Sequence, residues 1–528
     1  MTQPTEQPGG VSAAPPVLHV GVHARNAPDK TAVIEAGTGR TRTFAELELR
    51  SARLAHILAD RGIDPGGHVA ALLVNQLEYF DVAWATQRSG LLLTPVNWHL
   101  TPAEVNYIVT DSGAQGVISA PALAGSLISD DADLAGPNLR FLTQGDDGDR
   151  REDFEDLEEA LARASSEPLR PEIEGAIMFY SSGTTGRPKG IVRTWAPVPY
   201  GTPQAIDQLM AHYYGFDSNS VYLCPAPLYH AAPLAWSMGT QRLGGTVVLM
   251  ERFEPVELLR LIEQFRITHI QMVPTMFVRL LKLEQSQRGQ YDLSSLRYVI
   301  HAAAPCPVEV KTQMLEWLGP IIYEYYSSSE GVGFTTIDPQ EWGSHPGSVG
   351  KALMGKAHIL GDDGEELPVG AIGTVYFEGV GAFEYHHDPG KTAQAYDRRG
   401  WSTVGDLGSL DQEGYLYLSD RRTNLIISGG VNIYPKEIED VLVMHPSVTD
   451  VAIIGIADPD MGQQVKAIVQ PVDPSAGPAL ASELQAFCRE RLAGFKCPRS
   501  VEFVDELPRL PTGKLAKATL NEQYAPPS

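Results

Sequence analysis

Residues 181–190, SSGTTGRPKG, decide how the rest of this chain is interpreted. An apolar run at residues 176–180 precedes this stretch and another at residues 191–192 follows it, which predicts a loop between two strands. Its three glycines allow backbone amides to approach a ligand closely, and its hydroxyls and single lysine add side-chain donors. Such a flexible, donor-rich loop suits a polyphosphate.

The stretch is not a Walker A loop, which requires Gly-Lys-Ser/Thr leading into a helix. Here Pro188 precedes Lys189 and Gly190 follows it, and neither residue suits that geometry. The alternative is an ordinary polar turn of the kind that Gly, Ser and Thr commonly form. The density of hydroxyls and the closing Pro-Lys-Gly favour a ligand-binding loop.

Bulk properties exclude several classes of protein. A chain of 528 residues is long enough for two or more domains, and a net charge of −24 argues against nucleic acid or an anionic membrane as partner. The four cysteines form no CxxC pair, and no apolar run is long enough to span a bilayer. We therefore expect a soluble, cytoplasmic protein without an integral membrane segment, preceded by a disordered tail at residues 1–16.

Hydrophobic periodicity predicts an α/β fold. Strands are expected at residues 69–74, 91–96, 221–223, 246–250, 267–273 and 297–301. Amphipathic helices are expected at residues 43–62, 78–88, 256–265, 276–283 and 308–317. This alternation implies parallel sheets that are covered on both faces. For residues 124–170 we expect only a surface excursion, with a charged helix near residues 152–164.

A second domain is expected after a boundary near residues 420–423. A helix opening near Pro435, strands at 451–456 and 465–470, and a last helix predict a small α+β domain. Apolar residues at helical spacing in the last helix are expected to form core: Leu484, Phe487, Cys488, Leu492 and Phe495. The predicted division is a tail at 1–16, an N-terminal domain at 17–421 and a C-terminal domain at 422–528.

The SSGTTGRPKG stretch resembles the phosphate-binding signature of the adenylate-forming (ANL) superfamily, which includes acyl-CoA synthetases, luciferases and nonribosomal adenylation domains. The resemblance runs from about residue 20 to 520 and carries at least five ordered motifs. It implies a large domain of βα-type sheets, a small mobile C-terminal domain, and ATP, Mg²⁺ and coenzyme A as cofactors. On this resemblance the residues that bind ATP in the loop are Ser181, Ser182, Gly183, Thr184, Thr185, Gly186 and Lys189.

Residues 325–331, YYSSSEG, are similar to the family's Tyr-Gly-x-Thr-Glu pattern, with Ser327 and Ser329 as departures. The resemblance implies that Tyr326 stacks on adenine, that Ser329 contacts the α-phosphate and that Glu330 holds Mg²⁺, a cation that prefers carboxylate oxygen. Tyr325 and Ser327 belong to the same ATP-binding segment. Without the resemblance, these residues are also typical of a solvated helix cap.

Two further segments complete the expected nucleotide site. Residues 302–305, AAAP, follow a strand end, where α/β sheets commonly bind ligands, although a plain turn is the alternative. The spacing to the next motif resembles that of the family's adenine loop, which comprises Ala303, Ala304 and Pro305. Asp406 follows a glycine turn and suits the ribose hydroxyls, with an ordinary turn Asp as the alternative. Arg421 resembles the superfamily arginine that also reaches the ribose.

The expected acyl and CoA positions rest mainly on the resemblance. It places His230 at the acyl pocket and pantetheine channel, with Ala231 and Ala232 leaving room for an acyl group; a structural histidine is the alternative. It also places Gly429 and Gly430 in a wall of the pantetheine tunnel, where an ordinary turn would be the local interpretation.

Lys514, in the C-terminal Pro-Thr-Gly-Lys, is the strongest single catalytic candidate. An ammonium on a mobile loop can neutralise a developing carboxylate–phosphate transition state, and the family's catalytic lysine stands at this place. The alternative is a solvated lysine. At the hinge, Thr423 departs from the family's usual Asp or Lys. The neighbouring His386 and His387 are weak as a metal site, because neighbouring side chains diverge and no third ligand is evident.

These residues are identified as those of an AMP-forming acyl-CoA synthetase that acts on a carboxylic acid. FEYHHDPGKT, residues 383–392, resembles bacterial acyl-CoA ligases of the fatty-acyl, aryl or steroid type. Two alternatives within the superfamily are an acyl-AMP ligase that loads an acyl carrier protein and an enzyme of one half-reaction. A catalytically silent nucleotide sensor is the alternative from another class. The sequence leaves the acid and the oligomeric state open, a homodimer included.

Overall fold

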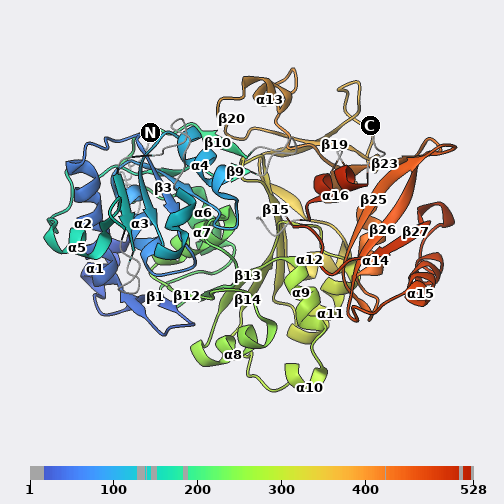
Figure 1. Cartoon of the computed structure of the whole chain (residues 1–528), viewed down its shortest axis with the longest axis horizontal. Coiled ribbons are helices and arrows are strands. Elements are labelled where there is room, and N and C mark those ends of the chain that lie inside the picture. The colour runs from blue at the N-terminus through green and yellow to red at the C-terminus, as the bar shows by residue number, and fades with distance from the viewer. Residues whose placement is uncertain are drawn as a thin grey trace, which may run out of the picture.

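The computed structural model describes residues 17–127, 137, 139–143, 151–181, 188–421, 424–509 and 515–524. Figure 1 shows the elements up to β22 as one large body and the later elements as a smaller group beside it. The predicted tail at residues 1–16 lies outside the described residues. The mixed α/β class and the large and small parts confirm the predicted fold.

The largest sheet has nine strands in the order β17-β16-β15-β14-β13-β11-β12-β1-β2. Its central strands from β15 to β1 are parallel neighbours, and β2, β16 and β17 add antiparallel pairings at its two ends. Parallel strands need both faces covered, which accounts for their nearly continuous apolar sequences. The strands are β1 Thr31–Glu35, β2 Thr41–Thr43, β11 Val221–Cys224, β12 Thr246–Leu249, β13 His269–Met272, β14 Tyr298–His301, β15 Ile322–Ser327, β16 Phe334–Ile337 and β17 Lys351–Met354.

A second, parallel sheet has six strands in the order β7-β6-β5-β3-β4-β8. Its strands are β3 His68–Leu72, β4 Leu92–Pro95, β5 Ala114–Ser119, β6 Leu139–Leu142, β7 Glu155–Asp156 and β8 Ala176–Ile177. The expectation of only a surface excursion at residues 124–170 was wrong, because β6 and β7 extend this sheet. The expected charged helix is α5 Leu157–Arg163, which begins late because Asp156 ends β7 and caps the helix.

Two smaller sheets complete the large part. The first joins β9 Tyr180–Ser181, β10 Lys189–Arg193 and β20 Phe383–Tyr385 in the order β20-β10-β9. The predicted strands on either side of the glycine-rich loop are therefore present, and they include the first residue and the last two residues of the motif. The second sheet has the order β18-β19-β21-β22, with β18 Lys356–Leu360, β19 Gly373–Glu378, β21 Asp406–Leu410 and β22 Leu416–Arg421.

Helices separate and cover the sheets. Trp84 of α3 and Trp236 of α7 belong to one core cluster with strands of both large sheets, so these helices lie between the sheets. A second cluster packs α8, α9 and α11 on the other face of the nine-stranded sheet. The helices of the large part are α1 Val20–Asn26, α2 Phe44–Asp60, α3 Glu78–Arg88, α4 Pro102–Asp111, α5, α6 Ala205–His212, α7 Ala231–Arg242, α8 Pro255–Phe265, α9 Pro274–Leu281, α10 Gln285–Arg288, α11 Val308–Leu318, α12 Pro339–Ser344 and α13 Pro389–Gln394.

Local sequence explains where these helices begin. The Thr43 hydroxyl accepts from the Glu46 amide and the Glu46 carboxylate accepts from the Thr43 amide, a capping box that starts α2. The predicted helix at 78–88 coincides with α3, and the predicted strands at 221–223, 246–250, 267–273 and 297–301 are β11 to β14, most of them shorter by one to three residues. Among the helices of the described ranges, none is long and apolar enough to cross a membrane.

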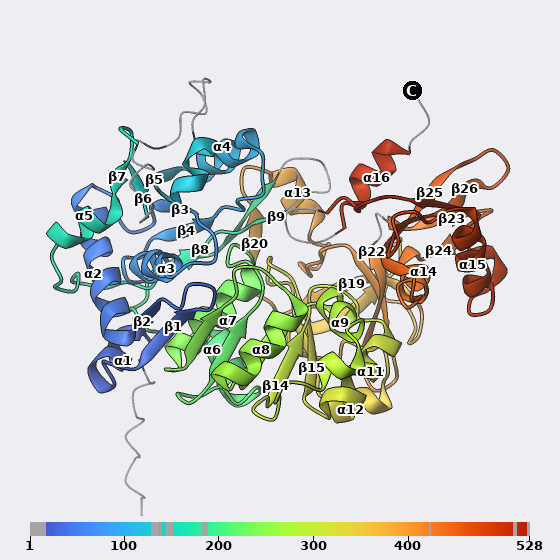
Figure 2. The same cartoon turned by 60° about the horizontal axis from the view of Figure 1, so that its bottom comes forward.

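The small part packs helices against a five-stranded sheet, which Figure 2 shows at the side of the large part. Its elements are β23 Ile426–Ser428, β24 Val431–Ile433, α14 Pro435–Leu442, β25 Val448–Asp458, β26 Gly462–Pro471, α15 Pro478–Arg489, β27 Ser500–Phe503 and α16 Lys517–Gln523. Leu484 and Cys488 are fully buried, as expected. The expectation for Phe495 was wrong: α15 ends at Arg489, so helical spacing no longer applies, and Phe495 is 55% exposed.

The small part contacts the large part through α9 and α14. The Lys282 ammonium, just beyond α9, donates to the backbone carbonyls of Val448 and Thr449. Val443 and Met444 also pack against the apolar cluster under α8, α9 and α11. These contacts join the two parts in the arrangement described here.

Candidate active site

Three predicted motifs follow strands that end at the same edge of the nine-stranded sheet. His230 comes after β11, Ala303 after β14, and Tyr326 lies at the end of β15. These strands are parallel in the order β15-β14-β13-β11, so the loops beyond their carboxyl ends meet at one edge. Open α/β sheets commonly bind ligands at this position.

Tyr326, Asp406 and Arg421 form one hydrogen-bonded group. The Tyr326 hydroxyl donates to Asp406 Oδ2 at 2.8 Å, and Arg421 Nε donates to Asp406 Oδ1 at 2.9 Å. Asp406 opens β21 and Arg421 ends β22, where the two residues are direct cross-strand partners. The pairing of β21 with β22 therefore brings the carboxylate and guanidinium together, and β15 supplies the tyrosine.

We expect Tyr326→Phe to raise the KM for ATP about 3- to 10-fold, because Asp406 loses one hydrogen bond while the aromatic ring remains. Steady-state kinetics with varied ATP would measure the change. Tyr323→Phe, on the same strand but packed against Tyr298, is the matched control and should leave this KM unchanged. A wild-type KM for Tyr326→Phe would mean that the hydroxyl does not help to position Asp406 for the nucleotide.

Glu330 lies opposite the strand that leaves the glycine-rich loop. Its Oε1 accepts a hydrogen bond from the Tyr385 hydroxyl at 2.9 Å. Arg193, at the end of β10, donates to the carbonyl of Ser329 at 2.9 Å. The predicted magnesium ligand and phosphate contact thus lie beside the hairpin that holds Lys189.

Lys189 and Ser181 stand at the two ends of the predicted phosphate loop. They are cross-strand partners in the β9–β10 pairing, and the Lys189 ammonium forms an ion pair with the Asp388 carboxylate. Hydrogen bonds from Lys189 and from the Lys391 amide hold the pKa of Asp388 below its ordinary value. The remaining predicted loop residues lie outside the described residues: Ser182, Gly183, Thr184, Thr185 and Gly186.

The predicted adenine loop begins with an unusual backbone conformation. Ala303 has a φ of 74°, a left-handed conformation that costs a non-glycine residue free energy and is often found at functional sites. Ala303 and Ala304 are exposed and Pro305 is half-buried, so the segment after β14 presents small residues at the surface of the site.

Two residues of the predicted ATP segment contact the protein itself. Tyr325 is 8% exposed, stacks on Phe334 and accepts a hydrogen bond from Trp236, so its side chain lies in the core. The Ser327 hydroxyl donates to the carbonyl of Gly333 at 2.9 Å. Alternation along β15 explains why Tyr325 and Tyr326 point to opposite faces.

His230 is the N-cap residue of α7, and its ring lies 4.4 Å from that of Tyr229, measured between centroids. Ala231 and Ala232, both half-buried, form the first turn of the helix. The small residues expected beside His230 are therefore at the helix start that faces the carboxyl edge of the sheet.

The predicted CoA-tunnel glycines lie in the small part. Gly429 and Gly430 form the two-residue turn between β23 and β24, with φ values of 57° and 79° that favour glycine. The Gly429 amide donates to the Met461 carbonyl within the small part, and a Cβ added at Gly430 would meet no atom within 4 Å. Lys514 lies outside the described residues, so the structure does not place it.

The family model described as AMP-binding enzyme matches residues 21–385, more than half of the chain. The model described as AMP-binding enzyme C-terminal domain matches residues 437–514. This chain belongs to the AMP-binding enzyme family. It is an enzyme of the AMP-forming acid–CoA ligase class, as the sequence predicted.

Known proteins are similar to this AMP-binding enzyme along nearly its whole length. A feruloyl-CoA synthase from Amycolatopsis sp is 33% identical, over 95% of this chain and 97% of the relative. A fatty acid–[acyl-carrier-protein] ligase from Streptomyces coeruleorubidus is 30% identical, over 95% of each. The crystal structure of ATP-bound MatB from Rhodopseudomonas palustris is similar with a TM-score of 0.78 at 29% identity, covering 96% of this chain and 99% of MatB.

Three residues of this AMP-binding enzyme's site had no predicted role: Arg193, Tyr385 and Lys391. Arg193 and Tyr385 lie on neighbouring strands because β10 pairs with β20, almost 200 residues later. The Lys391 ammonium lies over the Tyr385 ring, 4.3 Å from its centroid. The sequence offered one indication of Tyr385 and Lys391, because both lie in the segment FEYHHDPGKT that resembles bacterial acyl-CoA ligases.

The structure also supplies the third group that His386 and His387 lacked in the sequence. One ligand atom each from Asp111, His386 and His387 lie within 4.8 Å of one another. However, His386 Nε2 lies 2.9 Å from the Asp111 carbonyl, and Tyr180 donates to the Asp111 carboxylate. The His387 side chain is 70% exposed. Asp111 and His386 are thus already engaged in hydrogen bonds, and His387 is largely exposed to solvent.

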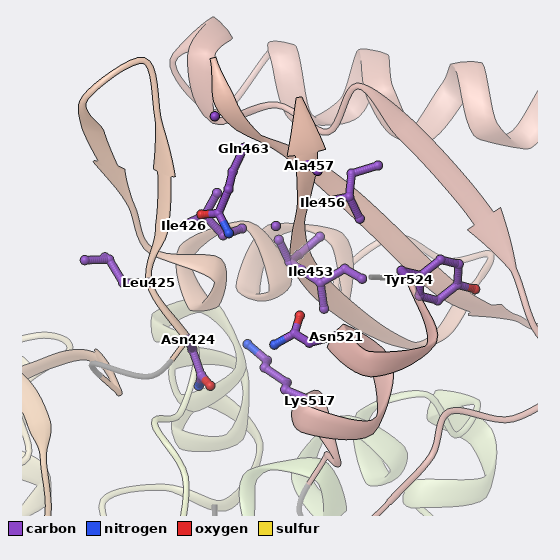
Figure 3. A pocket seen from close by; sticks show the side chains of 13 residues that line it. Asn424, Leu425, Ile426, Ile453, Ile456, Ala457, Gln463, Lys517, Asn521 and Tyr524 are labelled. Carbon is purple, nitrogen blue, oxygen red and sulfur yellow. The ribbon is translucent and has the colours of Figure 1, made fainter. Parts of the chain in front are cut away.

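A cavity of about 390 Å³ lies in the small part of this AMP-binding enzyme. Figure 3 shows Lys517 and Asn521 of α16, and Tyr524 just after this helix, facing Ile453 of β25 across it. Asn424 borders its lower side. Lys517 forms an ion pair with Glu439 at 2.7 Å, so its charge is already compensated.

Proposed function

We propose that the protein converts ATP and a carboxylic acid into acyl-AMP and pyrophosphate, and then transfers the acyl group to coenzyme A with release of AMP. The observation that carries this proposal is the hydrogen-bonded group of Tyr326, Asp406 and Arg421. Three residues expected from separate motifs to bind one nucleoside meet at the carboxyl edge of the sheet. The ATP-bound relative MatB supports ATP as the nucleotide.

In this proposal the nucleoside and the phosphates bind to different groups. Tyr326 stacks on adenine beside the small residues Ala303 and Ala304, and Asp406 accepts from the ribose hydroxyls with Arg421 beside it. The phosphates bind to Lys189 and to the hydroxyl-rich loop. Because the Lys189 ammonium is paired with the Asp388 carboxylate, this ion pair must open before Lys189 can bind a phosphate. Ser329 contacts the α-phosphate.

The Glu330 carboxylate fits the requirements of Mg²⁺, which prefers hard oxygen ligands and binds one or two carboxylates together with phosphate oxygens. It is held by the Tyr385 hydroxyl and lies beside the strand that begins with Lys189. Bound Mg²⁺ would neutralise charge on the phosphates. In the proposed role, Glu330 holds the cation and Tyr385 orients Glu330.

The proposed reaction has two steps. A carboxylate oxygen attacks the α-phosphorus, and the bond from that phosphorus to the pyrophosphate oxygen breaks. Lys514, brought from the small part, donates to the negative charge that develops between carboxylate and phosphate. The thiolate of CoA then attacks the acyl carbon, and the carbon–oxygen bond to AMP breaks. Gly429 and Gly430 would allow the pantetheine arm to pass close to the backbone.

The acyl pocket is proposed at the start of α7, where His230 caps the helix and Ala231 and Ala232 leave space. A named relative, the feruloyl-CoA synthase, supports CoA as acceptor. The carrier-protein ligase among the relatives supports acyl carrier protein as the second candidate. The cytoplasmic location, the homodimer and the division at residues 421 and 422 remain predictions.

The test is a screen of short-chain, long-chain, aromatic and polycyclic carboxylic acids for ATP-dependent AMP release. We expect release with at least one apolar acid, and a marked increase when CoA is added. An increase with acyl carrier protein but not with CoA would replace CoA by the carrier protein. Absence of AMP release and of pyrophosphate exchange with every acid would refute the proposed function.

A further inference from the structure

Lys391 is a cation in the site that the expected mechanism does not use. It belongs to α13, which Figure 1 shows beside β20, the strand that pairs with β10. Its ammonium lies 4.3 Å from the centroid of the Tyr385 ring, and the hydroxyl of the same ring donates to Glu330. The Tyr385 side chain therefore contacts both the Lys391 ammonium, at its ring face, and the predicted magnesium ligand, at its hydroxyl.

Charged side chains from four segments of the chain surround Lys391. Lys189, Glu330, Asp388 and Arg421 all act electrostatically on its ammonium, and Glu330 acts in the same way on Arg193. Within the described part of the chain, the group has four cations and three carboxylates. The cations are Lys189, Arg193, Lys391 and Arg421; the carboxylates are Glu330, Asp388 and Asp406.

This group has one surplus positive charge in a chain whose net charge is −24. Asp388 is paired with Lys189 and Asp406 with Arg421, whereas Lys391 contacts the face of an aromatic ring. Burial and the neighbouring Lys189 lower the pKa of Lys391 from its ordinary value, against the opposing effect of Glu330 and Asp388. An anion bound between the two lysines would relieve this repulsion.

We infer that Lys391 is a second phosphate-binding lysine, which together with Lys189 holds the β- and γ-phosphates of ATP and then the departing pyrophosphate. The inference rests on the proposed function, because it assigns a ligand group to the same site. Lys189 begins β10 and Lys391 lies on α13, so the two ammonium groups reach the phosphates from different elements. Tyr385 holds Lys391 by its ring face and Glu330 by its hydroxyl.

The experiment compares binding of AMP with binding of α,β-methylene-ATP, which the enzyme cannot cleave, by calorimetry. Lys391→Gln should weaken binding of the ATP analogue about 10- to 100-fold, as expected for loss of one charged hydrogen-bond partner, and leave AMP binding unchanged. Lys391→Arg, which keeps the charge, should restore most of the affinity. Lys356→Gln removes the same charge from an exposed lysine on β18 and should change neither affinity.

A second arm of the experiment removes Mg²⁺ with a chelator. If Lys391 contacts the phosphates, the difference between wild type and Lys391→Gln persists without the metal. If that difference vanishes, Lys391 acts only by positioning Glu330, and the inference is overturned. Equal weakening of AMP and analogue, or weakening of neither, also overturns it.

These outcomes are distinct from failure of the proposed function. Binding of the analogue requires no acid and no turnover, so a wild-type protein that binds it but activates no acid still tests Lys391. A wild-type protein that binds AMP but not the analogue would overturn the inference directly. A protein that binds neither nucleotide would overturn both.

Discussion

Lys514→Ala is expected to lower acyl-AMP formation about 100- to 1,000-fold, the loss typical of one electrostatic group aimed at a transition state. The same variant should form thioester from supplied acyl-AMP and CoA at nearly the wild-type rate. The reason is that Lys514 serves only the first step, if the small part reorients before the thiol attacks. Separate assays of pyrophosphate exchange and of thioester formation from synthetic acyl-AMP would measure the two rates.

Lys517→Ala is the matched control for this prediction. Lys517 lies three residues further along the same C-terminal segment, and its ammonium is paired with Glu439. Its loss should change the rate of adenylation by less than about 3-fold, in line with the small contribution of a single ion pair. Equal damage to both half-reactions by Lys514→Ala would show that this lysine is structural, and reorientation of the small part would lose its support.

Glu330→Gln is expected to lower adenylation about 100-fold or more at limiting Mg²⁺, because the change removes the carboxylate charge while keeping the size of the side chain. Excess Mg²⁺ should recover part of the loss. Binding of an uncleavable ATP analogue, measured with and without Mg²⁺, gives a readout apart from activity. In the variant, Mg²⁺ should no longer strengthen that binding.

Glu384→Gln provides the control, since Glu384 is an exposed carboxylate next to Tyr385 on β20. Its rate and its Mg²⁺ dependence should match those of the wild type. Unchanged turnover of Glu330→Gln at limiting Mg²⁺ would place the cation on other groups and leave the Tyr385–Glu330 hydrogen bond with a structural role.

Local patterns predicted the elements of this fold well, because each depends on residues close in sequence. The α3 helix and the strands β11 to β14 follow from apolar periodicity, and β9 and β10 lie at the apolar runs that flank the glycine-rich motif. β6 has four residues and β7 has two, so both are too short to carry such a pattern by themselves. They become strands because β6 pairs with the edge of β5 and β7 pairs in turn with β6.

The candidate site was predictable in its residues but not in its contacts. Tyr326, Asp406 and Arg421 were each expected to bind the nucleotide, but their hydrogen bonds depend on the β21–β22 register and on the place of β15 beside them. Lys391 was missed because its importance arises from the pairing of β10 with β20, which no local pattern encodes. Phe495 shows the opposite error, since helical spacing was extended past the end of α15.

The most direct test of the central claim follows an isotope from the acid to the nucleotide. An acid from the screen is labelled with oxygen-18 in its carboxylate and incubated with ATP and CoA, and the products are analysed by mass spectrometry. If the carboxylate attacks the α-phosphorus and the thiol then breaks the carbon–oxygen bond, each AMP carries one labelled oxygen and pyrophosphate carries none. Unlabelled AMP, or ADP with labelled phosphate, would contradict an acyl-AMP intermediate.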